Sequence, residues 1–379
     1  MKNYCNIELD DRRSAFCKYY LQQTGINPDR FHWDIHPEDE MFYKAILPGI
    51  YEKSIQKAYL KYLESGKRTL DVVEQIVQYC FSSFRNLGKL LEFACGHGRF
   101  SRYLVQKMPS DNVWASDIYQ SAVEWQKYYF GVNAIQSCAD PNDFFCDEKF
   151  SFILVGSLFS HLPDTAFKAW LKTMYDLLDD RGVLAFSVRD EDQLRNGQTM
   201  GKNGIVFSRE SESSTLSHDL YGLTQVTNDY VTKSLNELVA GGRQANYAHF
   251  KKALYENQAL YIVARDHSID LSGLDLKITP IGGVMHNFVN ERGERVINGW
   301  GIDLNPGKQI SEVQLLVNNK VMSTCEPVLG NYDVLKYFPK APNAPVAWSL
   351  IVEDKKIQDN NFLTCRMKSQ SGSKIIFFL

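Results

Sequence analysis

The chain has 379 residues, which predicts two or three domains, and its 44% hydrophobic and 23% charged residues are typical of a chain that folds around a core. Its 42 basic and 45 acidic residues give a net charge of −3, so the composition provides no broad attraction to nucleic acid or to an anionic membrane. The longest apolar stretch, residues 150–159, falls short of the roughly 20 residues that cross a membrane, and acidic residues occupy the place of a secretory signal. We therefore expect no nucleic-acid partner, no membrane span and a cytoplasmic location.

The eight cysteines are scattered along the chain, with no CxxC pair and no cluster of cysteine and histidine. Zinc sites and disulfide frameworks both need such patterns. We expect reduced thiols and no metal site.

Residues 1–87 are predicted to form an N-terminal helical extension. Apolar residues recur there at three- and four-residue intervals, which indicates one helix over about 50–63 and another over about 72–81. Gly66 is expected to separate the two helices.

Residues 88–266 are predicted to form an α/β domain of the Rossmann-like type. Short apolar strands alternate there with helices, and this order favours βαβ units in a doubly wound parallel sheet. A helix over 228–239 and a last strand over 259–264 close the domain. The preceding strands are expected at 89–93, 112–118, 134–137, 150–157 and 182–188, and the helices at 100–107, 121–129 and 165–178.

A polar stretch over 189–222 interrupts this alternation. It is rich in Ser, Asn, Gly and Glu, and we interpret it as an insertion that reaches over the carboxyl edge of the sheet. Long loops at that edge are commonly functional lids.

After a linker at 267–275, residues 277–379 are predicted to form an all-β sandwich of the immunoglobulin-like kind. Apolar residues there alternate with period two, and Asn318-Asn319 marks a turn. Five aromatic residues of this part could stack on sugars or pack in the core: Trp300, Tyr332, Tyr337, Phe338 and Trp348.

The first strand and turn of the α/β domain suit an adenosyl cofactor. Glu92 stands at the strand end, and Gly96-His97-Gly98 follows in the turn before a helix. Glycines let the backbone approach a ligand closely, and a helix N-terminus favours a carboxylate. Ser101 stands where a dinucleotide fingerprint has its third glycine or an alanine, which disfavours hydride transfer. The sequence also has no phosphate-binding GxxxxGK[ST] motif, which disfavours phosphoryl transfer.

Acidic residues follow the next two strands as well. Asp117 ends the second strand and could accept hydrogen bonds from both ribose hydroxyls, although Asp is also a common helix N-cap. Asp140 follows the third strand and could reach the adenine amino group, or it could serve as a turn residue before Pro141. For Glu92 the alternative is a position on the surface.

The segment Val155–Leu162 leads from the fourth strand into the place where open α/β sheets bind ligands. With the ACGHGR turn at 94–99 and the LLDDRGVL run at 177–184, the sequence resembles class I S-adenosylmethionine-dependent methyltransferases. It is similar in particular to bacterial members with a CGHGR turn, a VGSLxTHL-type fourth strand, a YG segment and an HQD-type last strand. The last two appear here as Tyr221-Gly222 and as residues 257–259, and the resemblance covers about 39–265.

Three residues depart from that pattern. Ala94 replaces the first glycine of the turn, Ser151 stands where an acid often opens the fourth strand, and Ala259 replaces the acid of the last-strand motif. The first two leave a cofactor site plausible, and the third puts the function of that motif in doubt.

The resemblance implies a seven-stranded sheet with its last strand antiparallel, S-adenosylmethionine as cofactor, and an acceptor near residues 157–161. It assigns cofactor binding to Glu92, Phe93, Ala94, Cys95, Gly96, Gly98, Arg99, Asp117, Ile118, Asp140, Gly156 and Ser157.

His161 is the candidate general base, because an imidazole ionises near neutral pH and this one follows the fourth strand. The alternative is a cap or loop-orienting role. His97 is expected to make a structural contact in the cofactor turn, and Cys95 is expected to be a small packing residue.

The GWGID, VNNK and NYDVLKYFP segments resemble a β-sandwich appended to bacterial enzymes that build surface glycans. The leading hypothesis is therefore O-methylation of a sugar hydroxyl in a surface glycan or its precursor, with possible binding of glycan-assembly proteins through the sandwich. Two alternatives stay open: methylation of a small metabolite, lipid or protein, and a cofactor-binding scaffold without catalysis.

Overall fold

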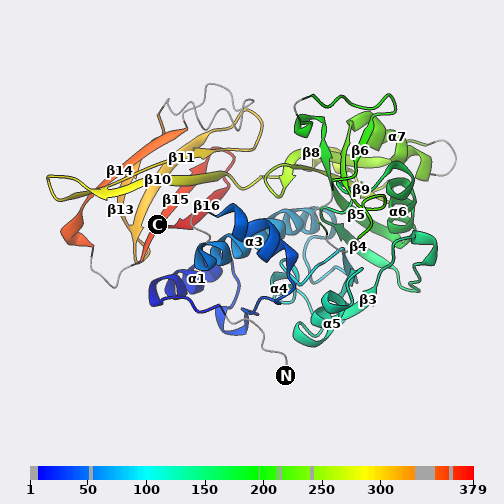
Figure 1. Cartoon of the computed structure of the whole chain (residues 1–379), viewed down its shortest axis with the longest axis horizontal. Coiled ribbons are helices and arrows are strands. Elements are labelled where there is room, and N and C mark those ends of the chain that lie inside the picture. The colour runs from blue at the N-terminus through cyan, green and yellow to red at the C-terminus, as the bar shows by residue number, and fades with distance from the viewer. Residues whose placement is uncertain are drawn as a thin grey trace. The chain divides into compact units, whose positions relative to one another are not determined.

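The computed structural model describes residues 7–50, 54–195, 197–210, 213, 216–239, 243–328, 346–357 and 362–379. They divide into two compact units (Figure 1). The first unit contains Ile7 and Arg30–Leu276, and the second contains Glu8–Asp29 and Lys277–Leu379. The segment 1–87 of the sequence-based division thus contributes to both units.

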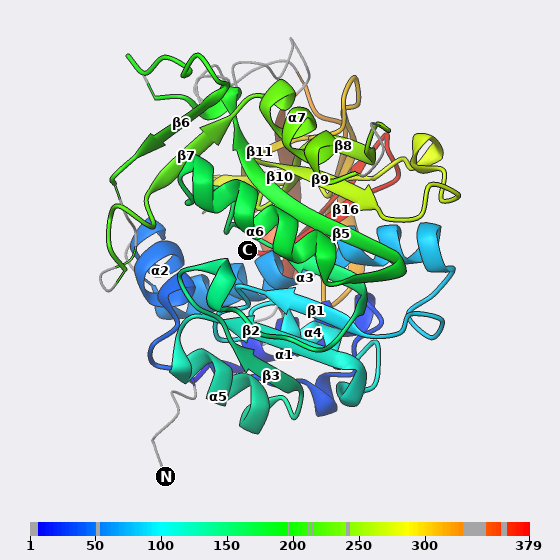
Figure 2. The ribbon, with the colours of Figure 1, turned by 90° about the vertical axis from the view of Figure 1, so that its right-hand side faces the viewer.

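The first unit is built on a sheet whose central strands are parallel and run in the order β3-β2-β1-β4-β5 (Figure 2). On the far side of β5, β9 pairs antiparallel with both β5 and β8. The expected seven-stranded Rossmann-like arrangement with an antiparallel last strand is confirmed, as part of a sheet of nine strands. Its strands are β1 (Leu90–Phe93), β2 (Val113–Asp117), β3 (Asn133–Gln136), β4 (Phe150–Val155), β5 (Leu178–Asp190), β8 (Asn246–Leu254) and β9 (Gln258–Ala264).

Strand β8 was not predicted from the sequence. It is an edge strand, most of its residues are only half-buried, and a mixed sequence of aromatic, basic and small residues fills it. Such a strand lacks the continuous apolar run that marks its buried neighbours.

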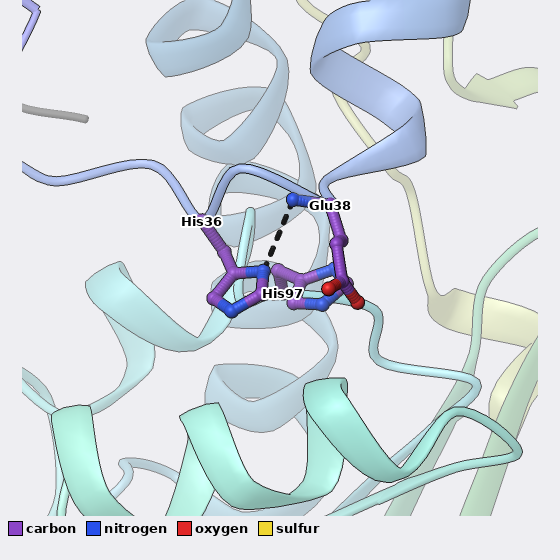
Figure 3. Close-up of side chains that lie close together, drawn as sticks. All are labelled: His36, Glu38 and His97. Carbon is purple, nitrogen blue, oxygen red and sulfur yellow. Dashed lines mark hydrogen bonds between the residues drawn. The ribbon is translucent and has the colours of Figure 1, made fainter. Parts of the chain in front are cut away.

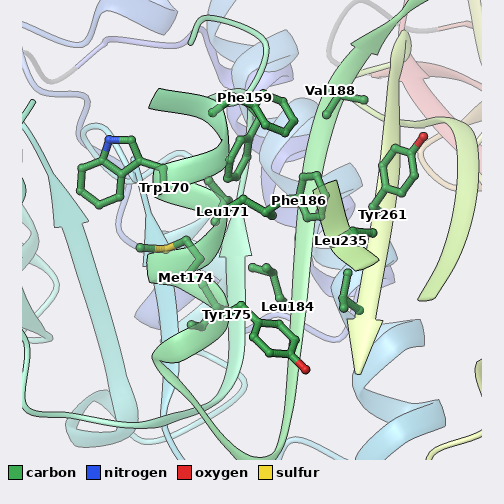
Figure 4. Packing of buried hydrophobic residues seen from close by; sticks show 14 of the residues in the cluster. Phe159, Trp170, Leu171, Met174, Tyr175, Leu184, Phe186, Val188, Leu235 and Tyr261 are labelled. Carbon is green, nitrogen blue, oxygen red and sulfur yellow. The ribbon is translucent and has the colours of Figure 1, made fainter. Parts of the chain in front are cut away.

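The helices pack beside this sheet and bury its core. They are α4 (Ser101–Leu104), α5 (Gln120–Tyr129), α6 (Asp164–Asp176) and α7 (Asn228–Leu238). Residues of α6, α7, β4, β5 and β9 share one cluster that includes Phe159, Trp170, Phe186 and Tyr261 (Figure 4). The helix expected over 100–107 is reduced to the four residues of α4.

The N-terminal part of this unit contains η2 (Met41–Ile46), α2 (Leu47–Gly49) and one long helix, α3 (Ile55–Phe81). The prediction of two helices separated by Gly66 is wrong, because Gly66 lies within the 27 residues of α3. A Cβ at this position would come within 2.2 Å of the Arg99 carbonyl oxygen and 2.8 Å of the Tyr103 ring. The glycine therefore lets two backbones approach closely and does not end a helix.

The insertion at 189–222 contributes β6 (Ile205–Ser208) and, at its end, β7 (Leu223–Val226). These strands form an antiparallel pair, and β7 continues beside the end of β5 through the pairing of Arg189 with Gln225. The insertion therefore begins and ends at the carboxyl edge of the sheet, as expected.

The second unit consists of two antiparallel sheets around one core. Ile297 and Trp348 of one sheet pack with Val313 and Met367 of the other. One sheet contains β10 (Ile281–Val289), β11 (Glu294–Ile302) and β14 (Ala347–Glu353). The other contains β13 (Lys320–Cys325), β12 (Ile310–Val317), β15 (Leu363–Ser369) and β16 (Lys374–Phe378).

Helix α1 (Asp11–Gln23) belongs to this second unit. The ring centroid of Phe16 lies 5.5 Å from that of Phe378, and that of Tyr19 lies 5.7 Å from Phe362. The all-β unit is thus completed by a helix more than 250 residues away in sequence, which local patterns could not reveal.

Of the aromatic residues considered for sugar stacking, Trp348 is buried in the core and Trp300 is half-buried against Ile281 and Ile302. Tyr332, Tyr337 and Phe338 lie outside the described residues.

Short 3₁₀ turns occur at Pro28–Arg30, Ser110–Asn112, Pro141–Asp143, Glu191–Gln193, Leu271–Gly273 and Asp354–Lys356. In the described part of the chain, none of the helices combines the length and the apolar character that crossing a membrane requires.

Candidate functional site

The candidate site lies where the strand order of the first unit reverses, between β1 and β4. Phe93 at the end of β1 pairs with Val155 at the end of β4, so the segments that follow both strands leave the sheet at the same edge. Open α/β sheets bind ligands at this kind of switch point. The topology therefore brings the turn at 94–99 and the segment at 156–161 together.

The turn after β1 contains three residues with left-handed backbone: Ala94 (φ 58°), Gly96 (φ 54°) and Gly98 (φ 88°). A Cβ on Gly96 would meet no heavy atom within 4 Å beyond its chain neighbours, so Gly96 faces open space. A Cβ on Gly98 would lie 2.2 Å from the Phe130 ring. Gly96 is thus the glycine that leaves room for a ligand, whereas Gly98 is required for packing.

Asp117 is connected to this turn by a direct hydrogen bond. Its Oδ2 accepts the backbone N–H of Gly96 at 2.8 Å, and its Oδ1 accepts the N–H of Tyr119 at 3.0 Å. The carboxyl group is buried, which raises its pKa, and the backbone N–H donors partly oppose the rise. Helix α5 is capped at Tyr119 without a side-chain bond, so Asp117 is not its N-cap.

Glu92 is also buried, with 7% of its surface exposed, and the alternative of a surface position does not hold. Its Oε2 accepts a hydrogen bond from the Ser101 hydroxyl at 2.6 Å. Burial raises the pKa of Glu92 to about 8, against the opposing effects of Ser101 and Arg99. Ser101, noted in the sequence only because it is not glycine, is the partner of this carboxyl group.

Two residues of the predicted set have their recorded side-chain contacts outside the turn at 94–99. The ring of Phe93 is buried in the core, with its centroid 4.9 Å from that of Trp170. Asp140 is exposed, and its Oδ1 accepts hydrogen bonds from the backbone and side chain of Asn142, a pattern that suits the turn role.

Three further residues of the set border the turn. Cys95 is buried, and burial raises the pKa of its thiol well above the usual range, which suits a packing role. The carbonyl group of Ile118 accepts a hydrogen bond from Gln136 at 3.3 Å. Arg99 donates to the Ser65 hydroxyl at 3.1 Å.

His97 lies between the turn and the N-terminal segment. Its ring stacks on that of His36 with centroids 4.3 Å apart and 6° between the planes, and Glu38 lies beside it (Figure 3). His36 Nδ1 accepts the backbone N–H of Glu38 at 3.1 Å, and His97 Nε2 lies 3.2 Å from the Ser121 hydroxyl. Burial lowers the pKa of His97 to about 4.

The donor atoms of His36, Glu38 and His97 are close enough to suggest a metal site. An imidazole binds a metal through a lone pair in the plane of its ring. Two rings stacked face to face direct these lone pairs into parallel planes, so they cannot meet at one ion in this arrangement. The structural role expected for His97 agrees with this geometry.

The segment after β4 is held by a hydrogen-bond network that sequence analysis did not foresee. The Ser157 backbone is left-handed (φ 66°), and its N–H donates to the Ser187 hydroxyl at 2.8 Å. Gln258, buried at the start of β9, accepts from that same hydroxyl at 2.6 Å and donates to the Ser157 hydroxyl at 2.8 Å. The network joins β4, β5 and β9 at the carboxyl edge of the sheet.

His161 is buried beneath the end of the insertion. Its Nδ1 lies 2.7 Å from the carbonyl oxygen of Gly222, and its ring stacks on Tyr221 with centroids 4.5 Å apart. A carbonyl oxygen can only accept, so Nδ1 carries the proton and Nε2 is the basic nitrogen. The Tyr221-Gly222 segment singled out in the sequence thus sets the tautomer of the candidate base.

The insertion also reaches the end of β2. The Ser213 hydroxyl, buried within the insertion, lies 2.8 Å from the hydroxyl of Tyr119, two residues after Asp117. The insertion therefore contacts both the segment after β2 and the segment after β4.

The residues of the turn fit S-adenosylmethionine. Gly96 leaves open space beside backbone N–H groups, and a carboxylate has about four acceptor positions, so Asp117 keeps capacity for ribose hydroxyls beside its two backbone donors.

Comparison with known proteins agrees with this geometry. Residues 59–225 match the family model described as "Methyltransferase domain". No curated protein sequence matches the chain.

Among solved structures, the chain is similar to an S-adenosylmethionine-dependent methyltransferase from Clostridium acetobutylicum (17% identity, TM-score 0.37, 52% of this chain and 91% of that one). It is also similar to CalS10, an amino pentose methyltransferase from Micromonospora echinaspora with S-adenosylmethionine bound (13% identity, TM-score 0.40, 54% of this chain and 96% of that one). A third similar structure is that of the sugar N-methyltransferase KedS8 from Streptoalloteichus (13% identity, TM-score 0.40, 54% of this chain and 88% of that one). These scores are too low to add to the family match. The family match and the fold together support a Rossmann-like methyltransferase domain in this part of the chain, and S-adenosylmethionine is the cofactor expected of it.

Proposed function

We propose that the protein transfers the methyl group of S-adenosylmethionine to a sugar hydroxyl of a bacterial surface glycan or its precursor, with His161 as general base. The observation that carries this proposal is the hydrogen bond from Nδ1 of His161 to the Gly222 carbonyl, which leaves Nε2 as the basic nitrogen. When bound, the cofactor supplies a methyl group whose bond to sulfur breaks as the acceptor oxygen attacks, leaving S-adenosylhomocysteine.

The residues on the β1 and β2 side hold the cofactor in this proposal. Backbone N–H groups around Gly96 receive its carboxylate, and Asp117 receives the ribose hydroxyls. Glu92 lies one strand residue before the turn, buried and bonded to Ser101. Methyl transfer mainly requires that acceptor and methyl group be aligned and close together, which a preformed turn favours.

The residues on the β4 side receive the acceptor. Nε2 of His161 takes the proton from the attacking hydroxyl, and such a base contributes about 10²- to 10⁴-fold to a rate. A hydroxyl needs such help because its oxygen is a weak nucleophile while protonated, whereas a neutral amine already presents a lone pair. A positioned imidazole therefore favours an oxygen acceptor over a nitrogen one.

The choice of a sugar rests on the resemblance of the second unit to sandwiches appended to surface-glycan enzymes. We propose that this unit binds glycan-assembly proteins and that the protein acts in the cytoplasm, where glycan precursors are made. Acceptors of other classes and a scaffold without catalysis are the alternatives that the experiment below separates.

The test measures transfer of a radiolabelled methyl group from S-adenosylmethionine to a panel of methyl pyranosides. The wild-type protein should methylate at least one, and His161→Ala should reduce turnover by about 10²-fold or more while S-adenosylhomocysteine binds with unchanged affinity by calorimetry. His286→Ala, at an exposed histidine of the second unit, is the matched control and should retain full turnover.

Two outcomes would contradict the proposal. Full turnover in His161→Ala would make this histidine a loop-orienting residue. Normal binding of S-adenosylhomocysteine without methylation of any pyranoside would contradict the sugar acceptor and leave the other acceptor classes and the scaffold.

A further inference from the structure

The hairpin between β8 and β9 brings a tyrosine to the end of β4. A Cβ built on Gly156 would lie 2.4 Å from the Tyr255 hydroxyl oxygen and 3.3 Å from the ring carbon that bears it. Gly156 does not have a left-handed backbone, so conformation does not demand glycine there. Its small size instead makes room for Tyr255, directly after the strand from which the acceptor segment begins.

Arg99 fixes the ring of Tyr255 from the cofactor side. The guanidinium carbon of Arg99 lies 4.3 Å from the ring centroid, within the range of a cation–π contact. Arg99 is in turn held by its hydrogen bond to the Ser65 hydroxyl of α3. Tyr255 therefore lies between the turn that holds the cofactor and the end of β4.

A group of four charged side chains ties the hairpin to α3. Lys61 Nζ lies 2.5 Å from Glu256, the residue after Tyr255, and Arg68 Nε lies 2.8 Å from Glu64 and 3.6 Å from Glu256. Burial opposes ionisation of Glu64, but Lys61 and Arg68 outweigh it and lower its pKa. The hairpin tip is thus anchored by alternating charges and not by apolar packing alone.

The backbone of the tip is strained. Tyr255 (φ 51°) and Glu256 (φ 68°) both have left-handed conformations, although neither is glycine. Such residues cost energy, persist only where their surroundings hold them, and tend to cluster at functional sites. A glycine or asparagine would suit the turn better, so a tyrosine here requires another reason.

We propose that Tyr255 forms the wall of the acceptor end of the site, next to the methyl group that is transferred, and limits the size of the group that can occupy that place. The proposal rests on the proposed function, because it assumes that the acceptor approaches over Gly156 and Ser157. It makes Tyr255 a specificity-determining residue, supplied by a hairpin beyond the part of the chain that matches the methyltransferase family.

The test uses two stable aza analogues of the cofactor, in which a tertiary amine replaces the sulfonium. One carries a methyl group on nitrogen and the other a benzyl group, and their dissociation constants are measured by calorimetry. The wild-type protein should bind the benzyl analogue about tenfold or more weakly than the methyl analogue. In Tyr255→Gly the ratio of the two constants should fall to near one, because the wall is gone.

Tyr255→Gly should fold, since glycine prefers the left-handed backbone of this position. Tyr255→Phe keeps the ring and should keep a high ratio, although removal of the hydroxyl lowers it slightly. Tyr128→Ala, which removes a tyrosine that is 78% exposed on α5, is the matched control and should leave both constants unchanged.

A wild-type ratio near one, or a high ratio that Tyr255→Gly leaves unchanged, would overturn the proposal while the methyl-transfer proposal stands. Failure of the wild-type protein to bind S-adenosylhomocysteine and both analogues would contradict both proposals. The pyranoside assay described above fails or succeeds independently, so the two proposals can be told apart.

Discussion

The two sides of the candidate site are built in different ways. On the cofactor side, Glu92, Gly96, Ser101 and Asp117 lie within 26 residues of one another, and their contacts join neighbouring turns. On the acceptor side, residues 156–161, 221–222 and 255–258 come from three distant segments. The cofactor side depends on local backbone conformation, whereas the acceptor side depends on how the insertion and the last hairpin fold back.

The largest loss of stability should follow from disturbing the packing of the turn at 94–99. Gly98→Val should unfold the protein or destabilise it by several kcal/mol, about 3 or more, because its Cβ would overlap the Phe130 ring and its backbone is left-handed. Gly96→Val shares the strain of a left-handed backbone (φ 54°) but meets no such overlap, so it should lose less stability than Gly98→Val and should lose binding of S-adenosylhomocysteine. Thermal unfolding and calorimetry separate the two. Equal stability of both variants would show that the two glycines are not distinct in role.

Substitutions of the two acidic residues Asp117 and Asp140 should differ in their effect on the affinity for the cofactor product. Asp117→Ala should weaken binding of S-adenosylhomocysteine by about tenfold to a hundredfold, since it removes charge-assisted hydrogen bonds and also frees the Gly96 N–H. Asp140→Ala should change the affinity little, because that carboxylate is exposed and bonded within its own turn. A comparable loss in both variants would restore Asp140 to the site.

The buried Glu92 predicts a pH dependence of stability on the cofactor side. Its pKa rises from the ordinary 4.5 to about 8 in the folded protein, so the folded state holds a proton that the unfolded state releases. Its contribution to stability is full below about pH 4.5 and is lost as the pH rises through about 8. Glu92→Gln cannot ionise and should flatten the fall in the free energy of unfolding between these values, measured by urea titration without cofactor. An unchanged slope would mean that Glu92 is already ionised in the fold.

The smallest change in stability should come from the contact between Gly156, after β4, and Tyr255 of the β8–β9 hairpin. Gly156→Ala should lower the free energy of unfolding by about 1 kcal/mol, because the new methyl group meets the Tyr255 hydroxyl. In a Tyr255→Phe background the same substitution should cost markedly less, since the nearest atom is absent. A double-mutant cycle with no coupling would place the hairpin away from β4.

Sequence analysis could judge best the residues whose partners are near in sequence. It predicted cofactor binding by Glu92, Gly96 and Asp117 from strand ends and a Gly-x-Gly turn. The structure joins Asp117 to Gly96 by a hydrogen bond and buries Glu92, and their binding of the cofactor stays a prediction. Phe93 and Asp140 were assigned by the same pattern, but the ring of Phe93 packs on Trp170 and the carboxylate of Asp140 bonds Asn142. A strand-end position predicts the place of the backbone and not the direction of the side chain.

The roles of the glycines were the hardest to predict from the sequence. Gly66 resembles a helix boundary but lies within α3, where it allows close contact with the segment before α4. Gly98 resembles a ligand-binding glycine but faces Phe130, and Gly156 makes room for Tyr255. The reason for a glycine is a neighbour that the local sequence does not contain.

The sequence by itself determined the features that follow locally from residue type. These are the alternation of strands and helices, an acid at each of two strand ends, and a glycine turn. Together they predicted the Rossmann-like sheet and its expected cofactor. The tertiary structure alone decided four features: the tautomer of His161, the position of Tyr255 against Gly156, the bond between Glu92 and Ser101, and the attachment of α1 to the β-sandwich unit. The physical reason is that hydrogen bonds and packing contacts act over a few ångströms in space. When the partners are tens or hundreds of residues apart, their distance follows from the completed fold.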